Sequence, residues 1–430
     1  MTILKIFIDR QIANHPGTRK LRRHFNIPAE TIDSITIVYD YVRGASDPID
    51  MGKKVLFITY NRGRFIRDCP GTRSYTCCGY RILHIGTYCT MDCAYCILQT
   101  YFHPPVLQFF VNHDDMFTEL DDLFTEKRVS RIGTGEFTDS LIWEPWTSLS
   151  RTLVQRFSHQ STAVLELKTK TTAIDTLLDL DHRKKTILSW SLNTQRVIRS
   201  QERGTASLSA RFRAAKTAQS HGYPLAFHFD PMVIYEGCAA EYQAVIHSLF
   251  THIRPNQIVW ISIGTFRFMP SLKAIIEERF PQSTLVYGES IPGLDGKMRY
   301  FKPLRIELYR KIIEAIRIHA PDVLIYFCME DDEVWRKSLG FTPEDRGGLS
   351  MMLDDSAIEK CGLIMAKTQG RKGREPCQMA NGMEDARPEH CDRRGMALSA
   401  NPSTSQDNKI GACPVGRRRG YGGINGWSKT

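Results

Sequence analysis

Short apolar strands and amphipathic helices alternate along residues 81–330, and this alternation limits the folds open to the chain more than any other feature. The segment AVLELKTKT (163–171) has the β-branched and leucine content of a buried strand. The segment HDDMFTELDDLFTEK (113–127) places its apolar residues on one face of a helix. Strands that alternate with helices of this length form parallel βαβ units. The sequence therefore predicts an α/β fold.

The alternation also predicts how the chain is divided. We count roughly six βα units, fewer than the eight of a closed barrel. We expect an N-terminal extension (1–80) packed on a barrel (81–350), followed by a low-order basic tail (351–430) that lacks helix or strand periodicity. The short polar stretches that follow the strands line the carboxyl edge of the sheet, where α/β proteins place their chemistry.

Charge and hydropathy narrow the classes of partner. The chain of 430 residues carries a net charge of +10. Residues 361–430 hold 12 basic and 6 acidic residues, so +6 of that charge falls in the predicted tail. The body is therefore only mildly basic, which permits a polyanionic partner without requiring one. No apolar run is long enough to span a membrane, and the first residues lack a signal-peptide pattern, so we expect a cytosolic protein with no membrane partner.

The stretch YCTMDCAYCILQ (88–99) carries the chemistry. It places Cys89, Cys93 and Cys96 in one C-x3-C-x2-C loop. A disulfide needs two thiols and a closed structural zinc site usually needs four, whereas three thiolates leave one iron of a four-iron cluster open to a small molecule. The alternative is a zinc knuckle that borrows a distant fourth ligand from Cys77, Cys78 or His84.

This loop, with the aromatic Tyr95 before its last cysteine, resembles that of the radical S-adenosylmethionine enzymes. The resemblance implies a partial (βα)6 TIM-like barrel with a [4Fe–4S] cluster on the three cysteines and S-adenosylmethionine on the open iron. It also implies that reduction of the cluster, by a donor such as flavodoxin or ferredoxin, yields a 5′-deoxyadenosyl radical that abstracts hydrogen from a substrate.

A closer resemblance covers about residues 53–345. CPGTRSYTCCGY (69–80), the cysteine loop and KMRY (297–300) are similar to segments of spore photoproduct lyase and its relatives. The resemblance implies a lyase whose substrate is a thymine dimer in DNA. Two alternatives stay open: an enzyme of the same branch that acts on another substrate, and a zinc-stabilised nucleic-acid-binding protein without enzymatic activity.

The resemblance also assigns residues to the S-adenosylmethionine site. The turn Gly133-Thr134-Gly135-Glu136 matches the turn that binds the amino group of the cofactor, with Glu136 as the anion. After the next predicted strand, a lysine can meet the cofactor carboxylate as a point charge. The matching strand-end residues are Thr169 and Lys170, followed by Ser191 and Asn193.

One position departs from the repair enzyme, which uses a cysteine shortly after this turn to return a hydrogen atom. Here Phe137 stands about where that thiol belongs. Cys328, at the end of the last predicted strand, is the best substitute, and Tyr95, Tyr101 and Tyr235 are weaker candidates. Basic and aromatic residues near the rim are expected to bind the substrate. They are Arg267, Lys297, Arg299 and Tyr300, with Lys302 and Arg305 nearby.

Overall fold

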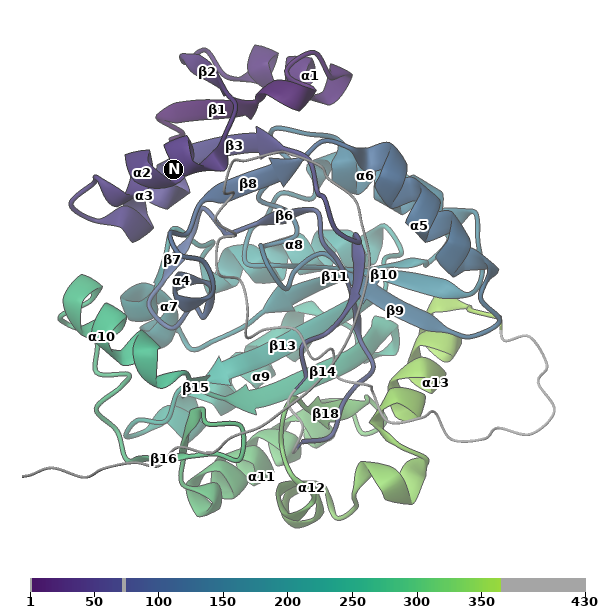
Figure 1. Cartoon of the computed structure of the whole chain (residues 1–430). Helices are drawn as coiled ribbons and strands as arrows, with labels where there is room; N and C mark the ends of the chain where they lie inside the picture. Colours follow the sequence, from purple (N-terminus) through teal and green to yellow (C-terminus); the bar gives the residue numbers. More distant parts are fainter. Residues whose placement is uncertain (1, 72–74, 365–430) are drawn as a thin grey trace, which may run out of the picture. The chain divides into compact units, whose positions relative to one another are not determined.

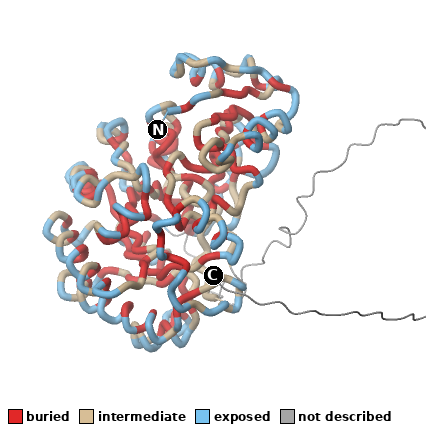
Figure 2. Tube along the Cα trace, turned by 90° about the vertical axis from the view of Figure 1, so that its left-hand side faces the viewer, coloured by how far each residue is buried: buried red, intermediate tan, exposed pale blue. Residues whose placement is uncertain are grey.

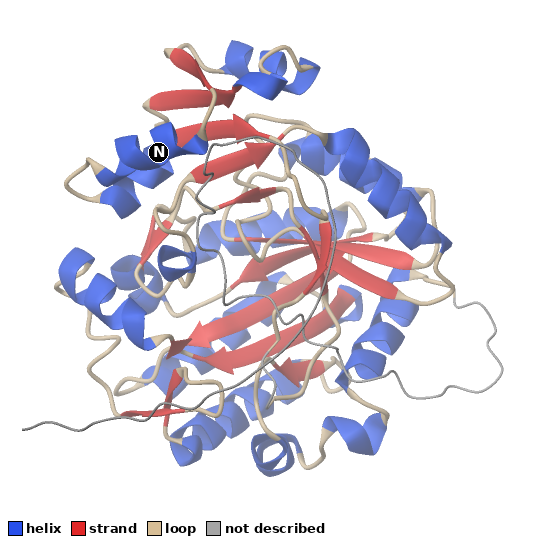
Figure 3. Ribbon diagram, in the orientation of Figure 1, coloured by secondary structure: helices blue, strands red, loops and turns tan. Residues whose placement is uncertain are grey.

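The structure is a computed structural model that describes residues 2–71 and 75–364. The strands of this part of the chain form four sheets, with five, eight, two and three strands (Figure 1). Figure 3 shows helices on the outer side of the eight-stranded sheet. Helix α13 (Leu349–Cys361) occupies the first residues of the predicted low-order tail, because its apolar residues pack against β14. The rest of the predicted tail, from residue 365 on, lies outside the described residues. The predicted division into domains stays a prediction.

The larger sheet has eight strands in the order β18-β14-β13-β11-β10-β9-β5-β4. Neighbouring strands are parallel from β18 to β5, and β4 is antiparallel to β5. The sheet curls into a half-barrel, which confirms the predicted α/β partial barrel (Figure 1). Its strands are β4 (Ile66–Asp68), β5 (Arg81–Leu83), β9 (Ser130–Gly133), β10 (Ala163–Thr169), β11 (Thr186–Ser191), β13 (Leu225–Met232), β14 (Ile258–Thr265) and β18 (Ile325–Phe327).

Helices connect most successive strands of the larger sheet, as expected for βαβ units. From the cysteine loop onward the helices that precede α13 are α4 (Leu98–Tyr101), α5 (His113–Thr125), α6 (Leu149–Ser158), α7 (Gln195–Gln201), α8 (Leu208–Ser220), α9 (Cys238–His252), α10 (Pro270–Arg279), α11 (Lys302–His319) and, after the last strand, α12 (Asp332–Leu339). The connection from β10 to β11 contains the 3-10 helix Asp175–Leu177, and further 3-10 helices cover Arg10–Ile12, Pro255–Gln257 and Pro343–Arg346. Helix α6 begins at Leu149, after Pro145, which cannot sit inside a helix.

The N-terminal extension shares a five-stranded sheet with two strands that flank the cysteine loop. The order is β2 (Ala29–Ile32), β1 (Lys5–Asp9) and β3 (Val55–Thr59), followed by β8 (Leu107–Phe110) and β6 (Gly86–Thr87). Helices α1 (Pro16–His24), α2 (Ile35–Arg43) and α3 (Pro48–Lys54) connect or cover these strands. The sheet therefore joins the extension to the segments on either side of the cysteine loop. The remaining short strands are β7 (Asp92–Cys93), β12 (Glu202–Arg203), β15 (Arg267–Phe268), β16 (Ser290–Pro292) and β17 (Met298–Tyr300).

The core lies between the sheet and its helices. Figure 2 shows the buried residues gathered in the interior and the exposed ones along the periphery. Each of β11 and β14 is buried along its whole length, as expected for strands covered on both faces. Among the largest fully buried side chains are Trp143, Trp190, Trp260 and Trp335. No helix of the described residues is long and apolar enough to cross a membrane.

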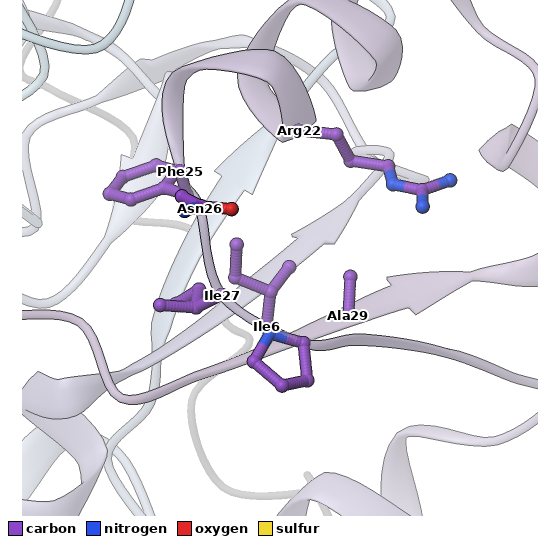
Figure 4. Close-up of a pocket in the computed structure, with 7 residues that line it drawn as sticks. Ile6, Arg22, Phe25, Asn26, Ile27 and Ala29 are labelled. Atoms are coloured by element: carbon purple, nitrogen blue, oxygen red, sulfur yellow. The ribbon is translucent and has the colours of Figure 1, made fainter.

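A surface cavity of about 390 Å³ lies in the N-terminal extension, between β1, the end of α1 and the start of β2. Figure 4 shows the guanidinium of Arg22 extending away from Phe25 and Ile27 at this cavity. A second cavity, of about 250 Å³, is lined by residues that include Lys184 and Glu359. Neither cavity is lined by a residue of the cysteine loop, so the candidate site rests on side-chain geometry instead.

Gly52 fixes how closely α3 packs on the chain that follows the cysteine loop. A Cβ added to Gly52 would lie 1.8 Å from the carbonyl oxygen of Pro105. We expect Gly52→Ala to destabilise the protein by about 1–3 kcal/mol through overpacking, although alanine gains about 1 kcal/mol of helix propensity. Chemical denaturation measures this difference.

Gly44→Ala is the matched control. The nearest atom to a Cβ at Gly44 is the Asp40 carbonyl oxygen, at 3.4 Å, and its φ of −71° suits any residue. We expect this variant to be neutral or stabilised by up to about 1 kcal/mol. Equal stability for the two alanine variants would contradict the close packing of α3.

Candidate functional site

The cysteine loop leaves β6 through Tyr88, whose φ of 69° is left-handed. Two hydrogen bonds and burial offset the strain of this conformation. The Tyr88 N–H donates to the Phe137 carbonyl at 2.8 Å, and the Tyr88 hydroxyl donates to the Ile49 carbonyl at 3.2 Å. The Tyr88 ring is fully buried. Cys89, Cys93 and Cys96 are not part of any disulfide, and Cys89 and Cys93 are buried. The three predicted ligands therefore lie on one loop, as the sequence predicts.

Gln99 holds the backbone of this loop in place. Its side-chain amide donates to the carbonyls of Cys93 at 3.1 Å, Ala94 at 3.2 Å and Cys96 at 3.4 Å. Gln99 is only 1% exposed, so these carbonyls need a protein partner. Gln99, the last residue of the stretch 88–99, thus has a structural role in holding the loop.

A buried ion pair ties the same loop to the end of α7. The Tyr95 hydroxyl donates to the Glu202 carboxylate, which also pairs with Arg211 at 2.5 Å. Burial by itself raises the pKa of Glu202, but the Arg211 guanidinium and the Lys170 ammonium hold this pKa below its usual value. Arg211 in turn donates to the Ser191 carbonyl at 2.8 Å, at the end of β11. Tyr95, predicted as a weaker hydrogen donor, is thus committed to a carboxylate.

The predicted cofactor turn lies beside the loop, at the end of β9. Glu136 is one-third exposed, and its nearest cation is the Lys168 ammonium at 4.0 Å. The Thr134 hydroxyl is buried and has no hydrogen-bond partner within the described part of the chain. A partly exposed carboxylate beside an unpartnered hydroxyl is the kind of polar edge that can receive an ammonium group.

Asp139 joins this turn to the next strand end, and sequence analysis missed it. Its carboxylate accepts from the Thr169 hydroxyl at 2.8 Å, the Lys170 N–H at 2.8 Å and the Leu141 N–H at 3.0 Å. Burial raises the pKa of Asp139 in spite of these bonds. Thr169 was predicted to bind the cofactor, but its hydroxyl is engaged by Asp139. The signal that could have found Asp139 is its position three residues after Glu136.

Two further predicted residues lie at or just after the end of β11. The Asn193 amide donates to the Pro231 carbonyl at 2.8 Å and accepts from the Tyr242 hydroxyl at 2.6 Å. Ser191, the last residue of β11, is buried. The Lys170 ammonium lies 5.8 Å from the centre of the Tyr95 ring, within the loop. The structure therefore brings Glu136 and Lys170 to the loop and uses Thr169 and Asn193 as supports.

The interior of the half-barrel carries paired charges that sequence analysis did not single out. Glu166 on β10 lies 2.8 Å from His228 on β13. Burial by itself raises the pKa of Glu166, but His228 overcomes this effect and lowers the pKa to about 2. Arg267, predicted to bind a polyanion, instead donates two bonds of 3.1 Å to Asp230, and this ion pair neutralises its charge.

The β16–β17 hairpin carries Arg299 and Tyr300, two of the residues predicted to bind the substrate. Arg299 is 4% exposed, pairs with Asp295 at 2.7 Å and lies 4.4 Å from the centre of the Tyr75 ring. Tyr300 is 6% exposed, so both faces of β17 are covered at these two positions. The role of Arg299 and Tyr300 in binding the substrate stays a prediction. Lys297 lies near Asp295 and the Met329 sulfur, Lys302 pairs with Asp331, and Arg305 pairs with Glu330.

Cys328 lies where the sequence predicts, directly after β18. Burial raises the pKa of its thiol to about 12, with Arg267, Asp230, Cys78 and Glu136 as charged or titratable neighbours. Cys69, at the end of β4, has Glu136, Cys78 and Cys328 among its own neighbours. Because β4 and β18 are the two edges of the curled sheet, the structure brings thiols from both edges toward Glu136.

Phe137 stands about where the repair enzyme of the family has the cysteine that returns a hydrogen atom. Its ring lies 5.0 Å from that of His84 and 6.5 Å from that of Tyr101. His84, named as a ligand in the zinc alternative, is packed between Phe137 and Phe110, and burial lowers its pKa to about 3. Tyr235, the other weak donor candidate, shares a hydrogen bond of 2.7 Å with Thr194 instead.

The thiol loop provides the donor set that an iron–sulfur cluster takes. Burial raises the pKa of Cys89 to about 12, so this thiol is neutral without a metal and must lose its proton on binding one. No three His, Cys, Asp or Glu side chains of residues 2–71 and 75–364 are grouped closely enough to hold a single metal ion. A zinc knuckle requires such a group, whereas a cluster takes each thiolate on a different iron.

Comparisons with known proteins agree with this site. A family model described as spore photoproduct lyase matches residues 72–300. A spore photoproduct lyase of Bacillus subtilis (strain 168) is 27% identical over 241 residues, which cover 55% of this chain and 68% of the relative. One from Clostridium acetobutylicum is 25% identical over 305 residues, which cover 69% of this chain and 86% of the relative.

A solved structure has the same fold. It is a spore photoproduct lyase variant with bound AdoMet and dinucleoside spore photoproduct, and it matches 76% of this chain and 99% of its own with a TM-score of 0.68 and 23% identity. The curled sheet and the three-thiol loop define the class, a radical S-adenosylmethionine lyase. The family model covers more than half of the 430 residues, and the chain belongs to the spore photoproduct lyase family.

The buried pair between Glu202 and Arg211 gives a stability prediction. Arg211 is fully buried, so Glu202→Gln keeps the shape of the side chain and leaves a buried cation without its partner. We expect a loss of about 3–5 kcal/mol, measured by chemical denaturation.

Asp181→Asn is the control for that variant, because its pair with Arg183 is exposed on both sides. This change is expected to stay within about 0.5 kcal/mol. If both variants unfold at the same denaturant concentration as the unmodified protein, the ion pair does not hold the loop.

Proposed function

We propose that the protein is a radical S-adenosylmethionine enzyme that repairs a thymine photodimer in DNA. The observation that carries this proposal is the family match over residues 72–300, which includes the three-thiol loop. The relatives named spore photoproduct lyase and the neighbour with bound dinucleoside photoproduct support the substrate. An external one-electron reductant, such as a flavodoxin or a ferredoxin, is part of the proposal.

Cys89, Cys93 and Cys96 would hold a [4Fe–4S] cluster, and Glu136 would hold the amino group of S-adenosylmethionine. When bound, the two groups supply a 5′-deoxyadenosyl radical, the hydrogen-abstracting species of this enzyme class. Lys170 provides a positive charge at the loop for the cofactor carboxylate. Asp139 keeps the two strand ends that carry Glu136 and Lys170 at a fixed separation.

Cys328 would return a hydrogen atom to the product radical. In this step the S–H bond breaks, a C–H bond forms on the thymine, and the unpaired electron stays on sulfur. Burial keeps the thiol protonated at neutral pH, which hydrogen-atom donation requires. Its position at the edge of the half-barrel, with Glu136 among its charged neighbours, supports this role.

Two observations favour a second candidate function. Phe137 cannot donate a hydrogen atom, and the basic residues expected to bind DNA, Arg267 and Arg299, are engaged by Asp230 and Asp295. These features suit an enzyme of the same class that acts on a substrate other than a DNA lesion. The photoproduct assay separates the two candidates.

The assay incubates the reconstituted protein with dinucleotide photoproduct, reductant and S-adenosylmethionine. We expect the photoproduct to revert to two thymines, measured by chromatography. Formation of 5′-deoxyadenosine without reversion would reject DNA repair and keep the radical class.

Anaerobic reconstitution of Cys93→Ala tests the cluster. The unmodified protein is expected to be brown with about four irons per chain, and the variant should lose most of this iron because the cluster loses a ligand. Cys361→Ala is the control, because that thiol lies in α13, outside the loop. A colourless protein with one zinc would reject the cluster and support the nucleic-acid-binding alternative.

Cys328→Ala tests the hydrogen donor. Thiol protons exchange with water, so repair in D2O should place deuterium in the thymine product, and the variant should lose this label together with most of the repaired product. Cys361→Ala again serves as the control. Full repair and full labelling by Cys328→Ala would exclude Cys328 as the donor.

A further inference from the structure

Lys53 is a buried lysine that the mechanism proposed above does not use. It lies in α3 of the N-terminal extension and its side chain is 1% exposed. Its ammonium donates to the carbonyls of Met91 at 2.6 Å and Cys89 at 3.3 Å, both within the cysteine loop. The same ammonium lies 4.2 Å from the centre of the Tyr88 ring. All three contacts are with the segment that carries the thiols.

The charge of this lysine has no carboxylate of its own. The nearest acid is Asp92, at 3.7 Å, but Asp92 also lies 3.0 Å from Arg279 and 3.8 Å from Arg203. Three cations therefore share one carboxylate beside the loop, although Arg279 has a second partner in Asp47. Burying an ammonium is costly unless a negative group compensates it. The described residues leave the positive charge at Lys53 largely uncompensated.

We infer that Lys53 is a positioning residue that holds the thiol loop and supplies a fixed positive charge to the cluster bound there. This inference rests on the proposed function, because it needs a cluster on the three cysteines. Three thiolates carry three negative charges to the loop, and reduction of the cluster adds one more. A nearby ammonium stabilises the reduced state more than the oxidised state, so it raises the reduction potential.

Lys53 is far from the cysteine loop in the sequence, although it contacts the loop in space. It comes from the N-terminal extension, 36 residues before Cys89, and reaches the loop because α3 packs on the chain at Pro105. The extension thereby contributes a residue to the metal site. Its neighbour Lys54 points elsewhere, pairs with Asp50 at 2.5 Å and is about one-third exposed.

The experiment compares the unmodified protein with Lys53→Met, Lys53→Arg and Lys54→Met. Each full-length protein is reconstituted without oxygen, its iron is counted, and the midpoint potential of the cluster is measured by a redox titration followed by electron paramagnetic resonance. The melting temperature of each apo protein reports folding. Lys53→Gln, which keeps hydrogen-bond donors without the charge, replaces Lys53→Met if that variant fails to fold.

We expect Lys53→Met to make the equilibrium constant for cluster reduction tenfold less favourable. For a one-electron couple this lowers the midpoint potential by about 59 mV. Lys53→Arg should have a midpoint potential close to that of the unmodified protein, and Lys54→Met should have the same potential as the unmodified protein. A folded Lys53→Met protein that holds little iron, while Lys53→Arg holds a full complement, also supports the inference.

Two results would overturn it. One is an unchanged potential and iron content in the neutral variants, and the other is an equal loss in Lys53→Arg and Lys53→Met, which would make shape rather than charge the cause. An unmodified protein without iron is a different outcome, because it rejects the proposed function together with the inference.

Discussion

The need to satisfy buried backbone groups in the thiol loop shapes the structure around it. Within the loop, the regular backbone pairing of the described residues is the two-residue ladder of β7 with β12, so several loop carbonyls accept hydrogen bonds from side chains. Gln99 takes three of these carbonyls and Lys53 takes two. One partner comes from the loop itself and the other from the N-terminal extension, so neither the barrel nor the extension can complete the site alone.

The interior of the half-barrel follows a second constraint, which is that buried charges require partners. Glu166 on β10 pairs with His228 on β13, two strands away in the larger sheet, and Asp230 on β13 pairs with Arg267 on β15, which belongs to the three-stranded sheet. Each pair therefore links elements that are not neighbours in one sheet. They leave Glu136 as a carboxylate held only by a cation at 4.0 Å, which keeps it available for a ligand.

Much of the fold could be predicted from periodicity, because strands such as 163–169 and helices such as 113–125 follow their hydrophobic patterns closely. The ligand loop could be predicted from its spacing. Asp139, Lys53 and Glu202 could not, since their roles depend on which segments meet in space. The burial of Arg299 and Tyr300 could not be predicted either, for the same reason: it depends on how the hairpin packs.

The thiol loop is an excursion whose two ends belong to one antiparallel ladder. Thr87, just before the loop, pairs with Gln108, and Gly86 pairs with Phe109. The separation of the two ends is therefore set by backbone hydrogen bonds and not by a bound group. Much of the entropy of closing this loop is already lost in the folded apo protein. The backbone frame of the loop is thus already closed without a bound group, so the binding of a cluster would not have to bring its two ends together.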